Sequence, residues 1–296
     1  MKHQIIDLNF GNHSETIASF LVETQAGPVL IETGPHSTLP ALEAGLANAG
    51  YKLSDVQHVL LTHIHLDHGG AAWVFANSGA KVYVHPAGQP HLADPSKLMA
   101  SATRIYKDDM DRLWGQMHAI PENRLVIVED RQSVKVGDQE FIAHHTPGHA
   151  IHHIAWQLGK DVFTGDVGGI RINKGPVVPP CPPPDIHIGH WMESIKRLES
   201  LNPARLFLTH FGEVTAVARH LAELKTILMD WALWMKPWAE QDADPKEVTP
   251  KFQEYVAEQL RNAGVEGENI ERYENANPAW MSVAGLIRYW KKYGNE

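Results

Sequence analysis

Short apolar runs, separated by glycine, proline and polar residues, occupy the first two thirds of the chain and predict β-strands. Between them lie stretches with helical spacing of apolar positions. The predicted strands are two or three hairpin strands within 4–33, then 56–61, 81–84, 124–128, 133–136, 139–145, 152–158, 161–165 and 205–209. The predicted helices are 39–49, 69–76, one or two within 95–118, and 189–200. This order predicts mixed α/β layers.

The pattern changes after Glu213. Residues 214–236, 246–262 and 277–293 are helix-like, and five of the nine tryptophans lie in this part of the chain, after Glu213. We therefore expect a first domain over 1–213 and a helical C-terminal subdomain over 214–296. The tryptophans either pack against the first domain, or form a homodimer contact or a wall of a substrate pocket, since tryptophan is favoured in interfaces and pockets.

The length, net charge and cysteine count of the chain limit the classes of protein that it fits. A chain of 296 residues can bury one sizeable core plus a small appendage. The net charge of −9 argues against nucleic acid as the main partner. A single cysteine, Cys181, excludes an intrachain disulfide and fits a reducing compartment. The start of the chain lacks the apolar core of a signal peptide, and 227–234 is too short to span a bilayer. We expect a cytoplasmic protein with no membrane partner.

The most informative motif is His63-Ile64-His65-Leu66-Asp67-His68, directly after an apolar run. In an extended segment, alternate side chains point the same way, so His63 and His65 can bind one ion. Asp67 continues that face, and His68 falls where the chain turns, so this pair could bind a second ion. Histidine and aspartate clusters without cysteine suit a hydrolytic divalent metal site.

Three later strands also end on a polar residue. An apolar run at 141–143 leads into a Pro-Gly turn that presents His149, the run 162–165 ends at Asp166, and 206–209 ends at His210. Side chains at the strand ends of a rigid sheet are well placed to hold a metal site.

In this order, the motif and the three later residues resemble the metallo-β-lactamase superfamily over about residues 1–215. The resemblance implies a four-layer αββα sandwich with two divalent metal ions. It implies that the first ion is bound by His63, His65 and His149, the second by Asp67, His68 and His210, and that Asp166 bridges both. The nitrogen and oxygen ligands suit zinc first, with iron or manganese as alternatives.

Three further features leave alternatives open. The family often has an early Ile-Asp-Thr-Gly turn, where this chain has Glu32. Glu32 either orients a ligand through a hydrogen bond or faces solvent in a turn. The proline-rich segment, residues 176–184, contains six prolines and is either a preformed substrate wall or a rigid crossover. The pairs at 144–145 and 152–153 each have at most one histidine facing the site, and one of these could orient a ligand.

The predicted activity is metal-dependent hydrolysis of a small ester, lactone or thioester. Two ions about 3.5–4 Å apart can activate a shared water as hydroxide, which attacks the carbonyl carbon. Asp67 is the predicted catalytic residue, because it can hold or accept the proton of that water. A serine nucleophile motif of the Gly-x-Ser-x-Gly type is absent from the sequence.

Other activities share this pattern of residues. Members of the superfamily include iron-dependent persulfide dioxygenases, which are oxidoreductases, and ribonucleases. A ribonuclease needs a basic, aromatic-lined surface, whereas Arg288 and Lys291-Lys292 form only a small patch. A secreted β-lactamase fits poorly with the expected cytoplasmic location. A small-molecule substrate is therefore the expected partner.

Overall fold

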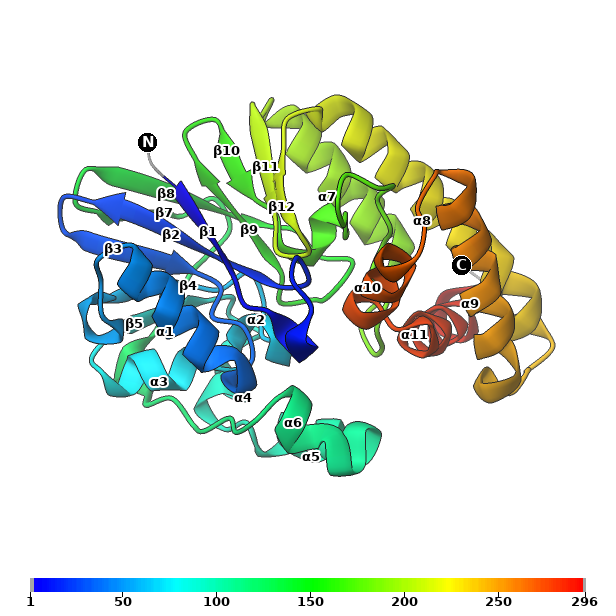
Figure 1. Ribbon diagram of the computed structural model, residues 1–296, viewed down its shortest axis with the longest axis horizontal. Coiled ribbons are helices and arrows are strands. Elements are labelled where there is room, and N and C mark those ends of the chain that lie inside the picture. Colours follow the sequence, from blue (N-terminus) through cyan, green and yellow to red (C-terminus); the bar gives the residue numbers. More distant parts are fainter. Residues whose placement is uncertain (1–2, 295–296) are drawn as a thin grey trace. The chain divides into compact units, whose positions relative to one another are not determined.

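The computed structural model describes residues 3–294 and consists of two six-stranded sheets with flanking helices, followed by a group of C-terminal helices (Figure 1). The predicted α/β sandwich with a helical C-terminal extension is confirmed. Among the described residues, no helix has the length and apolarity needed to cross a membrane.

The first sheet has the strand order β1-β2-β3-β4-β5-β6. The first three strands are antiparallel, and β3 to β6 run parallel. In the parallel pair β3–β4, Ile31 lies opposite Leu60, so the residues that follow both strands emerge at the same edge. The strands are β1 (His3–Asp7), β2 (Ala18–Thr24), β3 (Gly27–Ile31), β4 (His58–Leu60), β5 (Lys81–Val84) and β6 (Leu125–Ile127).

Helices cover one face of this sheet. Leu21 and Leu30 of the strands share a core with Leu42 and Phe75 of the helices, and all four side chains are buried. Phe20, next to Leu21, points to the opposite face and is also buried, so the sheet is covered on both sides. The helices are α1 (Leu39–Asn48), α2 (Leu66–Gly69), α3 (Ala72–Asn77), α4 (Gln89–Ala93), α5 (Ser96–Tyr106) and α6 (Met110–Leu113).

The second sheet has the strand order β12-β11-β10-β9-β8-β7. Strand β9 is bonded to the chain just beyond β4: the Trp156 indole N–H donates to the Leu61 carbonyl at 2.9 Å, and the Ile154 N–H donates to the Thr62 carbonyl at 2.7 Å. These bonds fix the start of the histidine motif. The strands are β7 (Ser133–Val136), β8 (Gln139–His145), β9 (Ile154–Leu158), β10 (Asp161–Phe163), β11 (Arg205–Leu208) and β12 (Gly212–Val214).

Backbone contacts divide the chain into two compact units. The first unit extends to His145 and includes Ile154–Phe163, whereas the second contains Thr146–His153 and the chain from Thr164 onwards. The loop between β8 and β9 therefore leaves the first unit and brings His149 into the second. The predicted boundary near residue 213 stays a prediction.

The second unit is mainly helical. Trp231 is buried and meets Phe252 edge to face at 5.0 Å, so this tryptophan packs between two C-terminal helices. The sequence pattern did not predict α10 or β12. Beside the 3-10 helix η6 (Gly165–Gly168), the helices are α7 (Ile188–Ser200), α8 (Val217–Glu240), α9 (Pro245–Asn262), α10 (Glu268–Ala276) and α11 (Ala279–Tyr293).

Candidate metal centre

The first unit brings His63 and His65 together directly after β4. His63 Nε2 lies 2.9 Å from His65 Nδ1, so the two rings offer one nitrogen each to the same point. The other nitrogen of His63, Nδ1, lies 3.0 Å from the Thr62 hydroxyl. A hydrogen bond at Nδ1 fixes the ring and leaves Nε2 available as a ligand atom. Sequence reasoning missed this role of Thr62, although its position next to His63 was a usable signal.

Asp67 and His68 lie on the short helix α2, which begins one residue after His65. His68 Nε2 lies 3.7 Å from Asp67 Oδ2, and the His68 ring centroid is 3.9 Å from that of His63. His68 is fully buried, whereas Asp67 is about a quarter exposed. The four polar residues of the motif therefore lie together beyond the end of β4. Asp67 does not continue an extended segment, because α2 begins at Leu66.

Glu32 is completely buried and lies directly behind His68. Its Oε1 is 3.4 Å from His68 Nδ1 and also accepts the Thr62 N–H at 3.2 Å. The position has a φ of 64°, which turns the chain sharply after β3. Of the two expectations for Glu32, the solvent-facing turn is wrong, and the residue is placed to orient His68 through Nδ1.

In the second unit, His149 follows a turn that only glycine can make. Gly148 has a φ of 136°, and a Cβ there would lie 2.4 Å from the Trp191 backbone. His149 Nδ1 lies 2.9 Å from the Pro180 carbonyl oxygen. Because a carbonyl only accepts, Nδ1 has the proton, and a neutral His149 presents the lone pair of Nε2. The sequence does not indicate this contact, because the carbonyl belongs to the backbone of a loop 31 residues away along the chain.

Asp166, on η6, lies between two histidines. Its Oδ2 is 3.2 Å from His149 Nε2, and its Oδ1 is 3.4 Å from His210 Nε2. All three side chains are at least 95% buried. A buried carboxylate that directs one oxygen to each of two imidazoles can bridge two cations.

Hydrogen bonds from other buried groups hold η6 in place. His153 Nε2 accepts the Val167 N–H at 3.4 Å, and the Trp191 indole N–H donates to the Val167 carbonyl at 3.0 Å. Both bonds fix the residue next to Asp166. His153 is therefore the member of the 152–153 pair that supports a candidate ligand. His144 instead bonds to Gln157 at 2.8 Å and has a structural role.

His220 of α8 also supports η6. Its Nε2 donates to the Gly168 carbonyl at 2.8 Å, and Arg171 donates to its Nδ1 at 3.3 Å. Burial lowers the pKa of His220 to about 4, so the ring is neutral at pH 7. Sequence reasoning assigned no role to this residue.

Each unit thus holds a set of candidate ligands of the same chemical character. The first unit supplies three imidazoles and one carboxylate, and the second supplies two imidazoles and one carboxylate. None of these ligands is a thiolate. The only cysteine of the sequence, Cys181, belongs to neither set, and its thiol donates to the Pro179 carbonyl at 3.6 Å. Such a donor set fits zinc, manganese or iron.

The fold and these two residue sets define a class of metal-binding α/β sandwich proteins. The sequence profile of the metallo-β-lactamase superfamily matches residues 15–210. The chain belongs to this superfamily.

Individual relatives agree with this assignment. The chain is 30% identical to the metallo-beta-lactamase fold-containing protein ST1585 of Sulfurisphaera tokodaii, over 62% of this chain and 73% of that protein. It is 25% identical to the probable metallo-hydrolase YqjP of Bacillus subtilis, over 64% of this chain and 65% of that protein. Its fold is similar to that of the metallo-beta-lactamase family protein TTHA1429 of Thermus thermophilus, with a TM-score of 0.72 and 19% identity, covering 99% of this chain and 94% of that one.

Proposed function

We propose that this protein is a hydrolase that uses two divalent metal ions, zinc first, to cleave a small ester, lactone or thioester. The observation that supports this proposal most directly is the placement of Asp166 between His149 and His210, with one carboxylate oxygen toward each. A buried carboxylate in this arrangement suits a bridge between two cations.

The proposed assignment gives each ion three ligands of its own and a shared carboxylate. The first ion is held by two histidines of the motif and the histidine of the Pro-Gly turn, and the second by the remaining pair of the motif and the histidine after β11. The residues proposed for the first ion are His63, His65 and His149. Those proposed for the second are Asp67, His68 and His210, and Asp166 is the proposed bridge. Membership of the superfamily and the geometry within each unit support this assignment.

Bound divalent ions lower the pKa of a water shared between them and polarise a substrate carbonyl. With the ions bound, Asp67 would hold this water and accept its proton, because its carboxylate is partly exposed while the adjacent His68 is buried. Glu32 and the Thr62 hydroxyl keep His68 and His63 in their ligand orientations. The net charge of −9 favours a small molecule over a nucleic acid as substrate. Cytoplasmic location stays part of this proposal.

Metal analysis combined with a substrate screen tests the proposal. Purified protein is assayed for zinc, iron and manganese, and for hydrolysis of lactones, thioesters and β-lactams. We expect two ions per chain, and we expect His65→Ala to abolish both the first ion and the activity. The matched control is His91→Ala, which removes an exposed histidine of α4. Activity that survives His65→Ala, or a wild-type chain without metal, would contradict the proposal.

The same preparation separates hydrolysis from oxygen chemistry. Oxygen consumption with glutathione persulfide, together with one iron per chain, would favour a persulfide dioxygenase. Two zinc ions per chain and no oxygen uptake exclude that activity.

A further inference from the structure

The proline-rich segment has few hydrogen-bond donors of its own. Six of its nine residues are prolines, which lack a backbone N–H. Its carbonyl groups must therefore accept hydrogen bonds from elsewhere, and its interior is buried, with Cys181 at 0% exposure. One of these carbonyls, that of Pro180, accepts the Nδ1–H of the candidate ligand His149.

Helix α10 and the turn that follows it supply donors to this segment. The Tyr273 hydroxyl accepts the Ile172 N–H at 3.1 Å and donates to the Pro176 carbonyl at 2.6 Å. The Asn277 side-chain amide donates to the Pro179 carbonyl at 3.2 Å. The Ser282 hydroxyl donates to Asn277 Oδ1 at 3.2 Å, which fixes the amide with its NH₂ group toward the segment.

Helix α11 holds the other side of Pro180. Gly285 lies so close to the segment that a Cβ there would be 2.0 Å from the Cys181 carbonyl oxygen. Arg288 donates to the Pro184 carbonyl at 3.2 Å. The two neighbours of Pro180 are thus held by Asn277 and by the backbone of Gly285.

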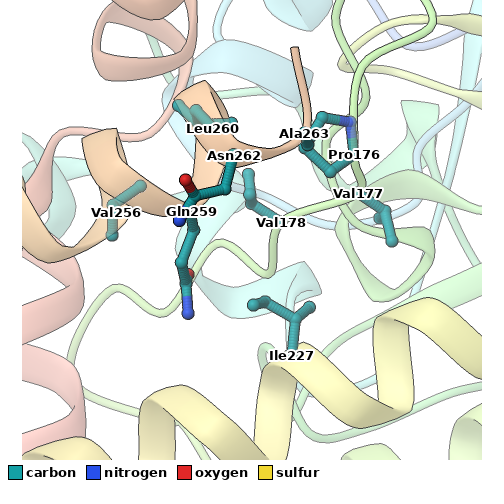
Figure 2. Close-up of a pocket in the computed structure, with 9 residues that line it drawn as sticks. All are labelled: Pro176, Val177, Val178, Ile227, Val256, Gln259, Leu260, Asn262 and Ala263. Carbon is teal, nitrogen blue, oxygen red and sulfur yellow. The ribbon is translucent and has the colours of Figure 1, made fainter. Parts of the chain in front are cut away.

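The first residues of the segment border a cavity of about 380 Å³ (Figure 2). Its other walls are Ile227 of α8, four residues of α9 and the residue after that helix: Val256, Gln259, Leu260, Asn262 and Ala263. Two backbone hydrogen bonds pair Val178 of the segment with Ile170, at 2.8 and 2.9 Å. Tyr273 and Asn277 bind the carbonyls of Pro176 and Pro179, one on each side of this bridge.

We propose that Tyr273 and Asn277 are positioning residues for the metal centre. They hold the proline-rich segment so that the Pro180 carbonyl meets His149 Nδ1, and this bond sets the direction of the ligand atom Nε2. The C-terminal helices thereby act on the metal through a backbone carbonyl. This inference rests on the proposed function, because it requires His149 to bind an ion.

Two pairs of variants test it in the full-length, zinc-loaded protein. Tyr273→Phe and Asn277→Ala remove a donor to the segment. Their matched controls are Tyr255→Phe, whose hydroxyl bonds to Asp230 at 2.6 Å, and Asn262→Ala, at the cavity on α9. We expect the first two variants to weaken zinc binding by up to about tenfold, since outer partners of metal ligands have effects of this order. A chromophoric chelator that competes for zinc measures the change, and the controls should match wild type.

The single cysteine offers a second readout. Cys181 is buried and burial raises the pKa of its thiol, so reaction with 5,5′-dithiobis(2-nitrobenzoic acid) reports opening of the segment. Zinc should slow this reaction in wild type, because coupling between two sites is reciprocal. His149→Ala should abolish that dependence. A purely structural role of α10 and α11 would leave the reaction rate independent of zinc.

A result that overturns the positioning role differs from one that overturns the proposed function. Folded Tyr273→Phe and Asn277→Ala proteins with wild-type zinc affinity, or controls that lose affinity equally, would overturn the positioning role while the proposed function stands. A wild-type chain that binds no divalent ion would overturn the proposed function itself.

Discussion

Replacing Gly148 by alanine tests how His149 is presented. The added Cβ would lie 2.4 Å from both the Cα and the nitrogen of Trp191, and these are backbone atoms of α7 that cannot rotate away. To reach an ordinary contact of about 3.5 Å, one of the two backbones must move by roughly 1 Å. The shift falls next to the residue whose Nε2 lies 3.2 Å from Asp166 Oδ2.

Two effects lower the free energy of unfolding of Gly148→Ala. Overpacking costs about 1–3 kcal/mol, and a φ of 136° in an alanine costs about 1–3 kcal/mol more. We therefore expect the free energy of unfolding to fall by about 2–6 kcal/mol. Metal–ligand distances tolerate only about ±0.2 Å, so a displacement of about 1 Å should lower zinc affinity at least about 100-fold.

The control variant is Gly264→Ala. Gly264 has a φ of 83°, but no atom lies within 4 Å of the added Cβ, so only the backbone cost applies. Urea denaturation of the metal-free proteins gives the free energies of unfolding, and chelator competition gives the zinc affinities. If Gly148→Ala is no less stable than Gly264→Ala and keeps its zinc affinity, the close approach to Trp191 does not position His149.

Three further predictions concern other residues. Glu32→Gln should lower the affinity for the second ion by about tenfold, measured as zinc per chain at limiting zinc; full occupancy would show that Glu32 does not orient His68. Asp67→Asn should lower kcat by about 100-fold or more, and a smaller loss measured with a substrate found in the screen would remove Asp67 as the proton acceptor. The pKa of His220, about 4, is below its usual value of 6.5, so the unfolded chain binds the extra proton and stability falls as pH decreases from 6.5 to 4. Between pH 7 and pH 5 this loss is about 2 kcal/mol, and urea denaturation of His220→Gln at both values should show a weaker pH dependence than wild type.

Most elements of the sandwich followed from local patterns. The strands β5, β7 and β8 and the helix α7 lie within a residue or two of their predicted ranges, because alternation and helical spacing are properties of short stretches. Helix α10 was not predicted: its interior is mostly charged and polar, and its one buried residue, Tyr273, is not a periodic signal. The strand β12 was not predicted for a different reason: it has only three residues, and its pairing with β11 is what identifies it as a strand.

The candidate ligands were visible in the sequence because each follows an apolar strand or a Pro-Gly turn. Their seven-residue assignment to two ions stays a prediction. By contrast, the burial of Glu32 behind His68 arises from the parallel pairing of β3 with β4, which strands 27 residues apart achieve only in the folded sheet.

The chain order of apolar and polar residues was sufficient for mixed α/β layers. The histidine motif and the three later ligand candidates indicated the superfamily, and the sandwich followed from that resemblance. The sequence left open which groups orient the ligands. Glu32 was one of two alternatives, and the group that orients His149 is a backbone carbonyl, which the sequence does not indicate. The Pro180 carbonyl that fixes His149, and the contacts of Tyr273 and Asn277 with the same segment, depend on chain segments that meet only after folding. The sequence shows which hydrogen bonds a side chain is able to make. Which group a buried donor meets is decided by packing in the folded chain.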